Sequence, residues 1–346
     1  MNTVLDVRGL HKHFGKGAHR VEANAGVTMA AHAGQVVGLL GHNGSGKTTM
    51  VNQIVGLTRP DSGTITVGGI DATTHPALAR RLVSLQAQAN VPITGLTPRR
   101  AIELVGRMRG APARAMRSRA RELIEALDIG PWADVASQKV SGGIARLTAF
   151  AMCLARPAPL VVLDEPTNDV DPVRRRLLWT QIRRLADAGH AVLLVTHNVR
   201  ETERVVDRLV VLNHGQVLAQ GTPATLVHDR AGMLTLEVDQ APGQPPHWPA
   251  GITATPVGDH RSRAVVASDR AAALVAWAAD ELRTGAIERY ELSPVSLEDA
   301  YIDLVTGHHP AAAGADADQP DAAPLDEPDT TTESTNDPAA GQEHTA

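Results

Sequence analysis

The sequence of 346 residues predicts an α/β domain built on a parallel sheet, followed by a smaller α+β domain and an acidic tail. Apolar strands at residues 36–41, 160–166 and 190–198 alternate with helical segments, which is typical of a parallel sheet covered on both faces. Shorter strand-like and helical segments begin near residue 229. The last 36 residues hold nine Asp and Glu and no Lys or Arg.

The overall composition bounds the class of protein. Hydrophobic residues make up 43% and charged residues 21% of the chain, as in ordinary globular proteins. No apolar run approaches the length needed to cross a bilayer. Asp6 and Arg8 interrupt the first apolar residues, so no signal peptide is predicted. A single cysteine, Cys153, excludes a disulfide framework and suits a reducing compartment.

The charge is unevenly distributed along the chain. The total is −5 and residues 311–346 carry nine negative charges, so the preceding part is at about +4. That balance is too weak to suggest a nucleic-acid partner, and none is expected. Residues 310–346 lack large apolar side chains and are predicted to be disordered, with folding against a basic partner as the alternative.

The segments before the first motif and between the motifs follow simple patterns. Residues 2–14 alternate enough to predict an edge strand, which a Gly-rich turn follows. Residues 36–41 form a buried strand that leads into a helix ending near residue 57. Residues 60–71 predict a turn, a short strand and another turn. From Pro98 to about Leu127 the apolar spacing predicts a largely helical stretch.

A phosphate-binding motif follows the second strand. "GHNGSGKT" at residues 41–48 fits G-x-x-x-x-G-K-[ST], and a chance match is improbable in a chain with four lysines. Its glycines let backbone N–H groups converge on a β-phosphate, while Lys47 reaches the β- and γ-phosphates and the Thr48 hydroxyl ligates Mg²⁺. The residues predicted to bind the nucleotide phosphates are Gly41, Asn43, Gly44, Ser45, Gly46, Lys47, Thr48 and Thr49.

Two carboxylates end the strand that begins at Leu160. In a parallel sheet the carboxyl end of a strand faces the ligand crevice, so Asp164 is expected beside the magnesium and Glu165 closer to the γ-phosphate. There Glu165 would polarise the attacking water. A solvated turn is the alternative for such a pair in isolation, but the phosphate loop 117 residues earlier favours the catalytic interpretation.

A serine and two glycines open a predicted helix in "KVSGGIARLTA", residues 139–149. Ser141-Gly142-Gly143 has the composition of a second anion site. An ordinary serine-capped helix has the same local sequence and is the alternative.

Two further stretches follow in order: "LVVLDEPTNDVDP" starts 19 residues after Ser141, and "VLLVTHN" comes after it. Together, these motifs resemble the ATP-binding cassette of ABC transporters over roughly residues 3–225. The resemblance implies a P-loop NTPase cassette with a parallel core sheet, an antiparallel N-terminal sheet and a helical subdomain at about residues 89–150. It places the cassette in residues 1–228 and leaves residues 229–309 as a small α+β accessory domain.

The resemblance also implies how the nucleotide is used. Ser141, Gly142 and Gly143 of one chain would cover the γ-phosphate bound by Lys47 of a second copy, or of a paralogous cassette, so that ATP joins the dimer. Hydrolysis would then release it. The expected cofactors are ATP and Mg²⁺. The predicted metal ligands are Thr48, Gln88 and Asp164.

Four further residues match motifs of this family. His197 resembles the switch histidine that contacts the γ-phosphate, and Asp171 resembles the D-loop aspartate at the dimer seam. Gln88 resembles the Q-loop glutamine, which ligates Mg²⁺ and senses the membrane partner, with Gln86 as the alternative. Phe14 resembles the aromatic residue that stacks on adenine, with a core aromatic as the alternative.

Three positions depart from the family pattern. Ile144 stands where glutamine is usual, Leu147 where a basic residue is frequent, and His42 where proline is common. None of them removes a phosphate ligand or the catalytic carboxylate, so an active ATPase is expected. A regulatory cassette with little turnover is the alternative that Ile144 and Leu147 raise.

The C-terminal part indicates the direction of transport. "PVSLEDAYIDLVTG", residues 294–307, resembles the ending of ABC-2 exporter cassettes, the group of the daunorubicin-resistance ATPases. Ser296 with Asp299 is predicted to cap its helix and Gly307 to end it. The resemblance implies export of a small hydrophobic compound or drug through a separate membrane permease, with this chain peripheral on the cytoplasmic face. An importer cassette and a cassette without a role in transport are the alternatives.

Overall fold

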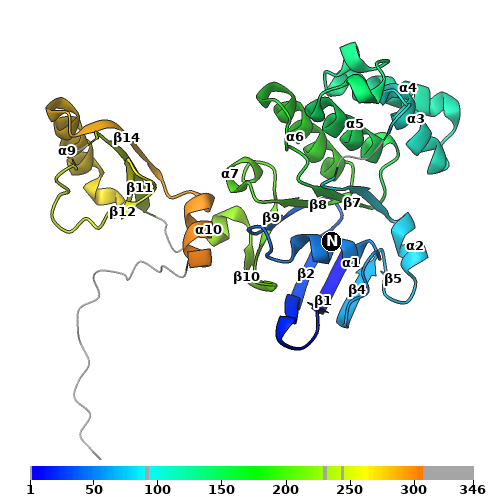
Figure 1. Ribbon diagram of the computed structural model, residues 1–346, viewed down its shortest axis with the longest axis horizontal. Coiled ribbons are helices and arrows are strands. Elements are labelled where there is room, and N and C mark those ends of the chain that lie inside the picture. Colours follow the sequence, from blue (N-terminus) through cyan, green and yellow to red (C-terminus); the bar gives the residue numbers. More distant parts are fainter. Residues whose placement is uncertain (1, 90–92, 229–231, 243–244, 307–346) are drawn as a thin grey trace, which may run out of the picture. The chain divides into compact units, whose positions relative to one another are not determined.

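The computed structural model describes residues 2–89, 93–228, 232–242 and 245–306. Within these ranges the strands form three sheets, with helices packed against them (Figure 1). The predicted terminator Gly307 and the acidic tail lie outside the described residues.

The central sheet has six strands in the order β10-β9-β3-β8-β7-β6. Five of them run parallel, and β10 is antiparallel to β9. All residues of β3, β7 and β8 are buried, as expected for strands that helices or another sheet cover on both faces. The strands are β3 (Val36–Leu40), β6 (Val83–Gln86), β7 (Leu160–Asp164), β8 (Ala191–Thr196), β9 (Arg208–Asn213) and β10 (Gln216–Gly221).

An antiparallel sheet forms the N-terminal part, in the order β2-β1-β4-β5. The prediction of an edge strand at residues 2–14 is wrong, because β1 pairs with β2 on one side and with β4 on the other. Its strands are β1 (Thr3–Phe14), β2 (Val21–His32), β4 (Ser62–Val67) and β5 (Ile70–Asp71). Helix α1 (Lys47–Ile54) lies between this sheet and the central one, and shares a buried cluster with both (Figure 1).

The other face of the central sheet is covered by helices. The predicted helical stretch from residue 98 to residue 127 is two helices, because Gly110 adopts a positive φ of 84° and Pro112 starts a new helix as its N-cap. Phe150 is fully buried in the cluster between these helices and the sheet. The helices are α3 (Pro98–Met108), α4 (Ala113–Ala126), α5 (Gly142–Ala155) and α6 (Pro172–Asp187).

Short elements connect the longer ones. The short α-helices are α2 (Pro76–Arg81), α7 (Val199–Thr202) and α8 (Pro223–Leu226). Single turns of 3₁₀-helix occur at Gly17–His19, Gly130–Trp132, Ser137–Lys139 and Ser268–Arg270.

The C-terminal segments form a third sheet, in the order β12-β13-β11-β14. Its strands are β11 (Met233–Gln240), β12 (Thr255–Pro256), β13 (Arg261–Ala267) and β14 (Ile287–Pro294), and the helices are α9 (Ala271–Thr284) and α10 (Leu297–Thr306). Leu274 and Ala278 of α9 share a separate buried cluster with Leu236 and Val238 of β11. These elements have the predicted α+β character, and the boundary at residue 228 stays a prediction. No helix within the described ranges is both long enough and apolar enough to span a bilayer.

Candidate nucleotide-binding site

The phosphate loop connects β3 to α1. Gly46 precedes the helix with a φ of 105°, and a Cβ there would lie 2.1 Å from the Ala23 carbonyl oxygen of β2. Gly44 also has a positive φ, of 84°. The loop therefore needs glycine at residue 46 both for its backbone conformation and for the close approach of a neighbouring strand.

Lys47 is buried under this loop. Its ammonium donates hydrogen bonds to the carbonyl oxygens of Gly41, at 2.6 Å, and His42, at 3.0 Å. Burial lowers the pKa of Lys47, and the nearby carboxylates of Glu165 and Asp164 oppose that shift. The ammonium is thus held at the centre of the loop by the loop's own backbone.

A cavity of about 380 Å³ opens beside the loop. It is lined by Val21, Glu22, Ala23, Asn43, Gly44, Gly46, Lys47, Thr48, Thr49, Gln88, Asp164 and Glu165. The fold therefore brings the phosphate loop together with Gln88 and the two carboxylates. Gln86, the alternative to Gln88, is buried and does not line this cavity. Gly41 and Ser45 lie beneath the loop, where a Cβ on Gly41 would be 2.3 Å from the Ser45 hydroxyl oxygen.

The two carboxylates differ in their surroundings. Asp164 is 4% exposed, and burial together with the adjacent charge of Glu165 raises its pKa to about 6. Glu165 has a φ of 48°, in the left-handed region that non-glycine residues seldom adopt. Its backbone N–H donates to the Val195 carbonyl at 2.9 Å, which joins the turn after β7 to β8.

The Glu165 carboxylate accepts hydrogen bonds at both oxygens. Oε2 accepts from the Thr196 hydroxyl at 3.0 Å, and Oε1 accepts from the His197 backbone N–H at 3.0 Å. The His197 Nδ1 atom lies 2.7 Å from the same Oε1. The His197 side chain is 56% exposed, so it is held by this contact while its other face stays accessible. Glu165 is thus fixed by the end of the neighbouring strand.

Asp164→Asn is expected to stabilise the protein in the absence of nucleotide. A pKa raised from 3.8 to about 6 means that folding stability is lost as the pH rises between these values, since the charged form is disfavoured in the folded state. At pH 7.5 the variant should gain about 2 to 3 kcal/mol, which raises the Tm by several degrees. Near pH 4 the gain should disappear.

Thermal unfolding of the nucleotide-free protein between pH 4 and pH 8 measures this effect. Asp259→Asn is the matched control, because Asp259 is exposed. A Tm difference between Asp164→Asn and the parent that does not change with pH would contradict the assigned cause.

The Ser141-Gly142-Gly143 turn lies at the surface of the chain. Ser141 caps α5, its hydroxyl oxygen accepting a hydrogen bond from the Ile144 N–H at 3.4 Å. Ser141 and Gly142 are exposed, and neither they nor Gly143 line the cavity of their own chain. A Cβ on Gly143 would lie 2.4 Å from the Asp169 carbonyl oxygen, so the segment after β7 packs directly against this turn.

The two residues of α5 that differ from the family pattern, Ile144 and Leu147, have buried side chains. Ile144 is 5% exposed and Leu147 is fully buried, and both belong to the cluster between the helices and the central sheet. Their apolar side chains therefore fill the core. They do not alter the exposed face of Ser141 and Gly142.

Asp171 and Phe14 are placed at the ends of elements. The Asp171 carboxylate caps α6 by accepting from the N–H groups of Val173, at 3.1 Å, and Arg174, at 3.0 Å. The Arg174 N–H is the main cause of the lowered pKa of Asp171. Phe14 is 48% exposed at the end of β1 and pairs with Val21, which lines the cavity. Phe14 itself is not among the lining residues.

Sequence reasoning missed Arg146. Its guanidinium is buried and donates to the carbonyl oxygens of Gln88, at 2.6 Å, and Ala87, at 3.3 Å. It thereby ties α5 to the segment that carries Gln88, and its charge lowers the pKa of Asp164 against the effect of burial. A signal was present, because Arg146 is the one charged residue of the otherwise apolar α5. Thr196 was also missed, although it directly precedes His197.

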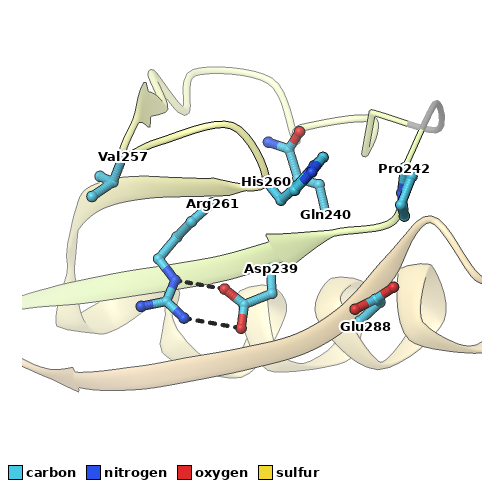
Figure 2. Close-up of a pocket in the computed structure, with 7 residues that line it drawn as sticks. All are labelled: Asp239, Gln240, Pro242, Val257, His260, Arg261 and Glu288. Atoms are coloured by element: carbon cyan, nitrogen blue, oxygen red, sulfur yellow. Dashed lines mark hydrogen bonds and ion pairs between the residues drawn. The ribbon is translucent and has the colours of Figure 1, made fainter.

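A second cavity, of about 420 Å³, lies in the C-terminal sheet (Figure 2). It is lined by Asp239, Gln240, Pro242, Val257, His260, Arg261 and Glu288. The Arg261 guanidinium is paired with both Asp239 oxygens, at 2.6 and 3.2 Å. No glycine is among the residues that line it, so it lacks the loop that marks the first cavity.

Known proteins share both the sequence and the fold. A family model described as ABC transporter matches residues 25–168. The chain is 32% identical over 307 residues to a Nod factor export ATP-binding protein I of Mesorhizobium japonicum, covering 87% of this chain and 86% of that protein. It is 36% identical over 230 residues to the daunorubicin/doxorubicin resistance ATP-binding protein DrrA of Streptomyces peucetius, covering 65% of this chain and 68% of that protein.

A solved structure confirms the cassette fold. The structure of an ATP-binding subunit of an ABC transporter matches with a TM-score of 0.60 and 26% identity, over 65% of this chain and 92% of that one. The predicted arrangement of a parallel core sheet, an antiparallel N-terminal sheet and a helical subdomain is therefore confirmed. The chain belongs to the ATP-binding cassettes of the ABC transporter family, whose members are ATPases.

Proposed function

We propose that this chain hydrolyses Mg-ATP in the cavity beside the phosphate loop and that hydrolysis powers export through a separate membrane permease. The observation that carries the proposal is the composition of one cavity, where Lys47 and Thr48 of the loop meet Gln88, Asp164 and Glu165. A phosphate-binding loop facing two carboxylates is the combination that phosphoryl transfer to water needs.

Residues 43–49 bind the phosphates in this proposal. The backbone N–H groups of the loop and the start of α1 supply positive potential, and Lys47 adds a full charge. The burial of Lys47 among loop carbonyls supports this role, because a buried ammonium gains most from an anionic ligand. The exposed ring of Phe14, which pairs with the cavity-lining Val21, stacks on adenine in this proposal.

Thr48, Gln88 and Asp164 would hold Mg²⁺. Hydroxyl, amide and carboxylate oxygens are the ligands that this ion prefers, and all three residues line the same cavity. The raised pKa of Asp164, next to Glu165 in a buried place, also fits, since a cation would relieve the repulsion between these groups. When bound, Mg²⁺ neutralises part of the phosphate charge.

Glu165 orients the attacking water and accepts its proton. Thr196 and His197 fix its carboxylate, so the carboxylate is already oriented before the water binds. His197, with its accessible ring, contacts the γ-phosphate. A general base that is positioned in this way contributes about 10² to 10⁴ to the rate.

Two cassettes close over two nucleotides in the proposed cycle. Ser141, Gly142 and Gly143 of one copy cover the phosphate that the other copy binds, with Asp171 at the seam. The exposure of Ser141 and Gly142, and their absence from their own cavity, support this assignment. Closure moves the segment at Gln88, which passes the motion to the cytoplasmic helices of the permease. A paralogous cassette is the alternative second copy.

The direction of transport is inferred from relatives. Proteins named for Nod factor export and for daunorubicin/doxorubicin resistance match this chain at 32% and 36% identity, and the first match covers most of the accessory domain. We infer export of a small hydrophobic compound, with the chain on the cytoplasmic face of the membrane. Residues 1–228 are the cassette, residues 229–309 the accessory domain and residues 310–346 the tail.

Phosphate release by the full chain, alone and with its permease in vesicles, tests this function. Turnover that requires Mg²⁺ and increases with the permease is expected. ATP binding without phosphate release under both conditions would favour the regulatory alternative.

A further inference from the structure

The short helix α7 begins two residues after His197. Asn198 precedes it, and the Asn198 side-chain oxygen accepts from the Glu201 N–H at 3.3 Å. The Asn198 N–H donates to the Thr196 hydroxyl at 3.1 Å, and that hydroxyl donates to Glu165. A movement of α7 therefore displaces two of the groups that fix the Glu165 carboxylate.

Two consecutive side chains of α7 bind two different neighbours. Glu201 pairs with Arg175 of α6, whose guanidinium also donates to the Val170 carbonyl at 2.9 Å, next to Asp171. Arg200 pairs with Glu298 of α10. The helix after the switch histidine is thus joined to the segment near the predicted dimer seam and to the last helix of the described chain.

Helix α10 also packs on the cassette through apolar contacts. It contacts α7, α8 and β10. Leu297 is 2% exposed and belongs to the same buried cluster as Val199, the first residue of α7, and Val206, which follows that helix. The Arg200 side chain is 70% exposed, so the ion pair sets the orientation of α10 while apolar burial supplies most of the attachment.

The first turn of α10 is equally tied to the C-terminal sheet. Asp299 is 5% exposed and accepts from the Thr235 hydroxyl of β11 at 3.0 Å and from the Arg263 guanidinium of β13 at 2.6 Å. It also accepts from the Ser296 N–H at 2.8 Å, while the Ser296 hydroxyl oxygen accepts from the Asp299 N–H at 3.2 Å. This is the predicted reciprocal cap, and it makes the turn a rigid connection.

We propose that α10 is a positioning element for hydrolysis: through Leu297 and Glu298 it holds α7, and α7 holds His197 against Glu165. This inference rests on the proposed function, since it assigns the accessory domain a role in the chemistry of that site. Leu297 and Glu298 contact the cassette, while Asp299 binds the sheet formed by β11 and β13. A change in the accessory domain is thereby transmitted to the catalytic carboxylate.

The phosphate loop lies between β3 and α1, and the carbonyl oxygens that hold its Lys47 ammonium belong to Gly41 and His42 of the loop itself, not to α7 or α10. Loosening α10 should therefore lower kcat and leave the affinity for ATP unchanged. Glu298→Arg places like charges together and removes the orienting pair. We expect kcat to fall about threefold to fivefold, as for the loss of a partly exposed ion pair that positions a catalytic group.

The experiment compares full-length Glu298→Arg, Arg200→Glu and the double variant with exchanged charges. Both single variants should lower kcat while the KM for Mg-ATP stays within about twofold, and the exchange should restore most of the rate. Asp280→Arg is the matched control, because Asp280 forms an exposed ion pair with Arg283 within α9, a helix of the same accessory domain. It should have no effect on kcat.

Amide hydrogen exchange over residues 197–206, without nucleotide, is the second measurement. It should become faster in each single variant and return to the parent rate in the double variant. Unchanged exchange and unchanged kcat in the single variants, or a double variant no better than they are, would overturn the inference. A parent protein without any ATPase activity would instead count against the proposed function, while the exchange rates still decide whether α10 holds α7.

Discussion

Glu165→Gln should bind Mg-ATP as the parent does and hydrolyse it about 10² to 10⁴ times more slowly. The amide keeps the shape of the side chain: its one oxygen can still accept from the His197 backbone N–H, while its NH2 group would face the Thr196 hydroxyl, which can accept. It cannot take a proton from water. The left-handed backbone at Glu165 is unaffected, so the fold and the loop geometry should be retained.

Single-turnover phosphate release and nucleotide titration measure the two effects separately. Glu125→Gln, on the exposed face of α4, is the control for the loss of one negative charge. A Glu165→Gln protein that retains a tenth or more of the parent rate would show that another group accepts the proton.

Lys47→Ala should reduce the affinity for ATP by about tenfold to a hundredfold and abolish hydrolysis. The change removes the one ammonium that lines the cavity and also leaves the Gly41 and His42 carbonyls without their donor. Both effects weaken the loop as a phosphate site.

Titration with a fluorescent ATP analogue and the rate of phosphate release check this result. Arg59→Ala removes an exposed positive charge shortly after α1 and should leave both quantities unchanged. Parent-like binding and turnover in Lys47→Ala would mean that the cavity is not where the nucleotide is hydrolysed.

The local motifs of this chain were predictable because their chemistry lies within a few consecutive residues. The phosphate loop, the two carboxylates at the end of β7 and the Ser141 cap each depend on contiguous sequence and on the end of one strand or helix. Their convergence could be expected as well, because parallel strands present their carboxyl ends to one crevice.

Features that depend on partners distant in sequence were not predictable. The second partner of β1, strand β2, has small and polar residues around Gly26, which weaken its strand signal, so the sequence predicts β1 at an edge. A local signal was overlooked as well: Gly110 and Pro112 mark the break between α3 and α4, although the apolar spacing continues across it. The pairing of Arg200 with Glu298 joins residues 98 positions apart and leaves no local trace.

The candidate site shows the same division. The family resemblance favours Gln88 over Gln86, and Gln88 is the one of the two that lines the cavity. The lone charge in α5 marks Arg146, but its contact with the Gln88 carbonyl depends on the packing of α5 against the end of β6, which the sequence of either segment does not specify. Residues that support a site from another element are therefore the part that sequence reasoning misses.

The oligomeric state of Glu165→Gln shows whether Ser141-Gly142-Gly143 serves the phosphate of a second chain. Size-exclusion chromatography with light scattering, with and without Mg-ATP, measures it against the monomer mass of 36.5 kDa. We expect a monomer without nucleotide and a dimer with Mg-ATP. A protein that binds ATP and stays monomeric at every nucleotide concentration would contradict this expectation.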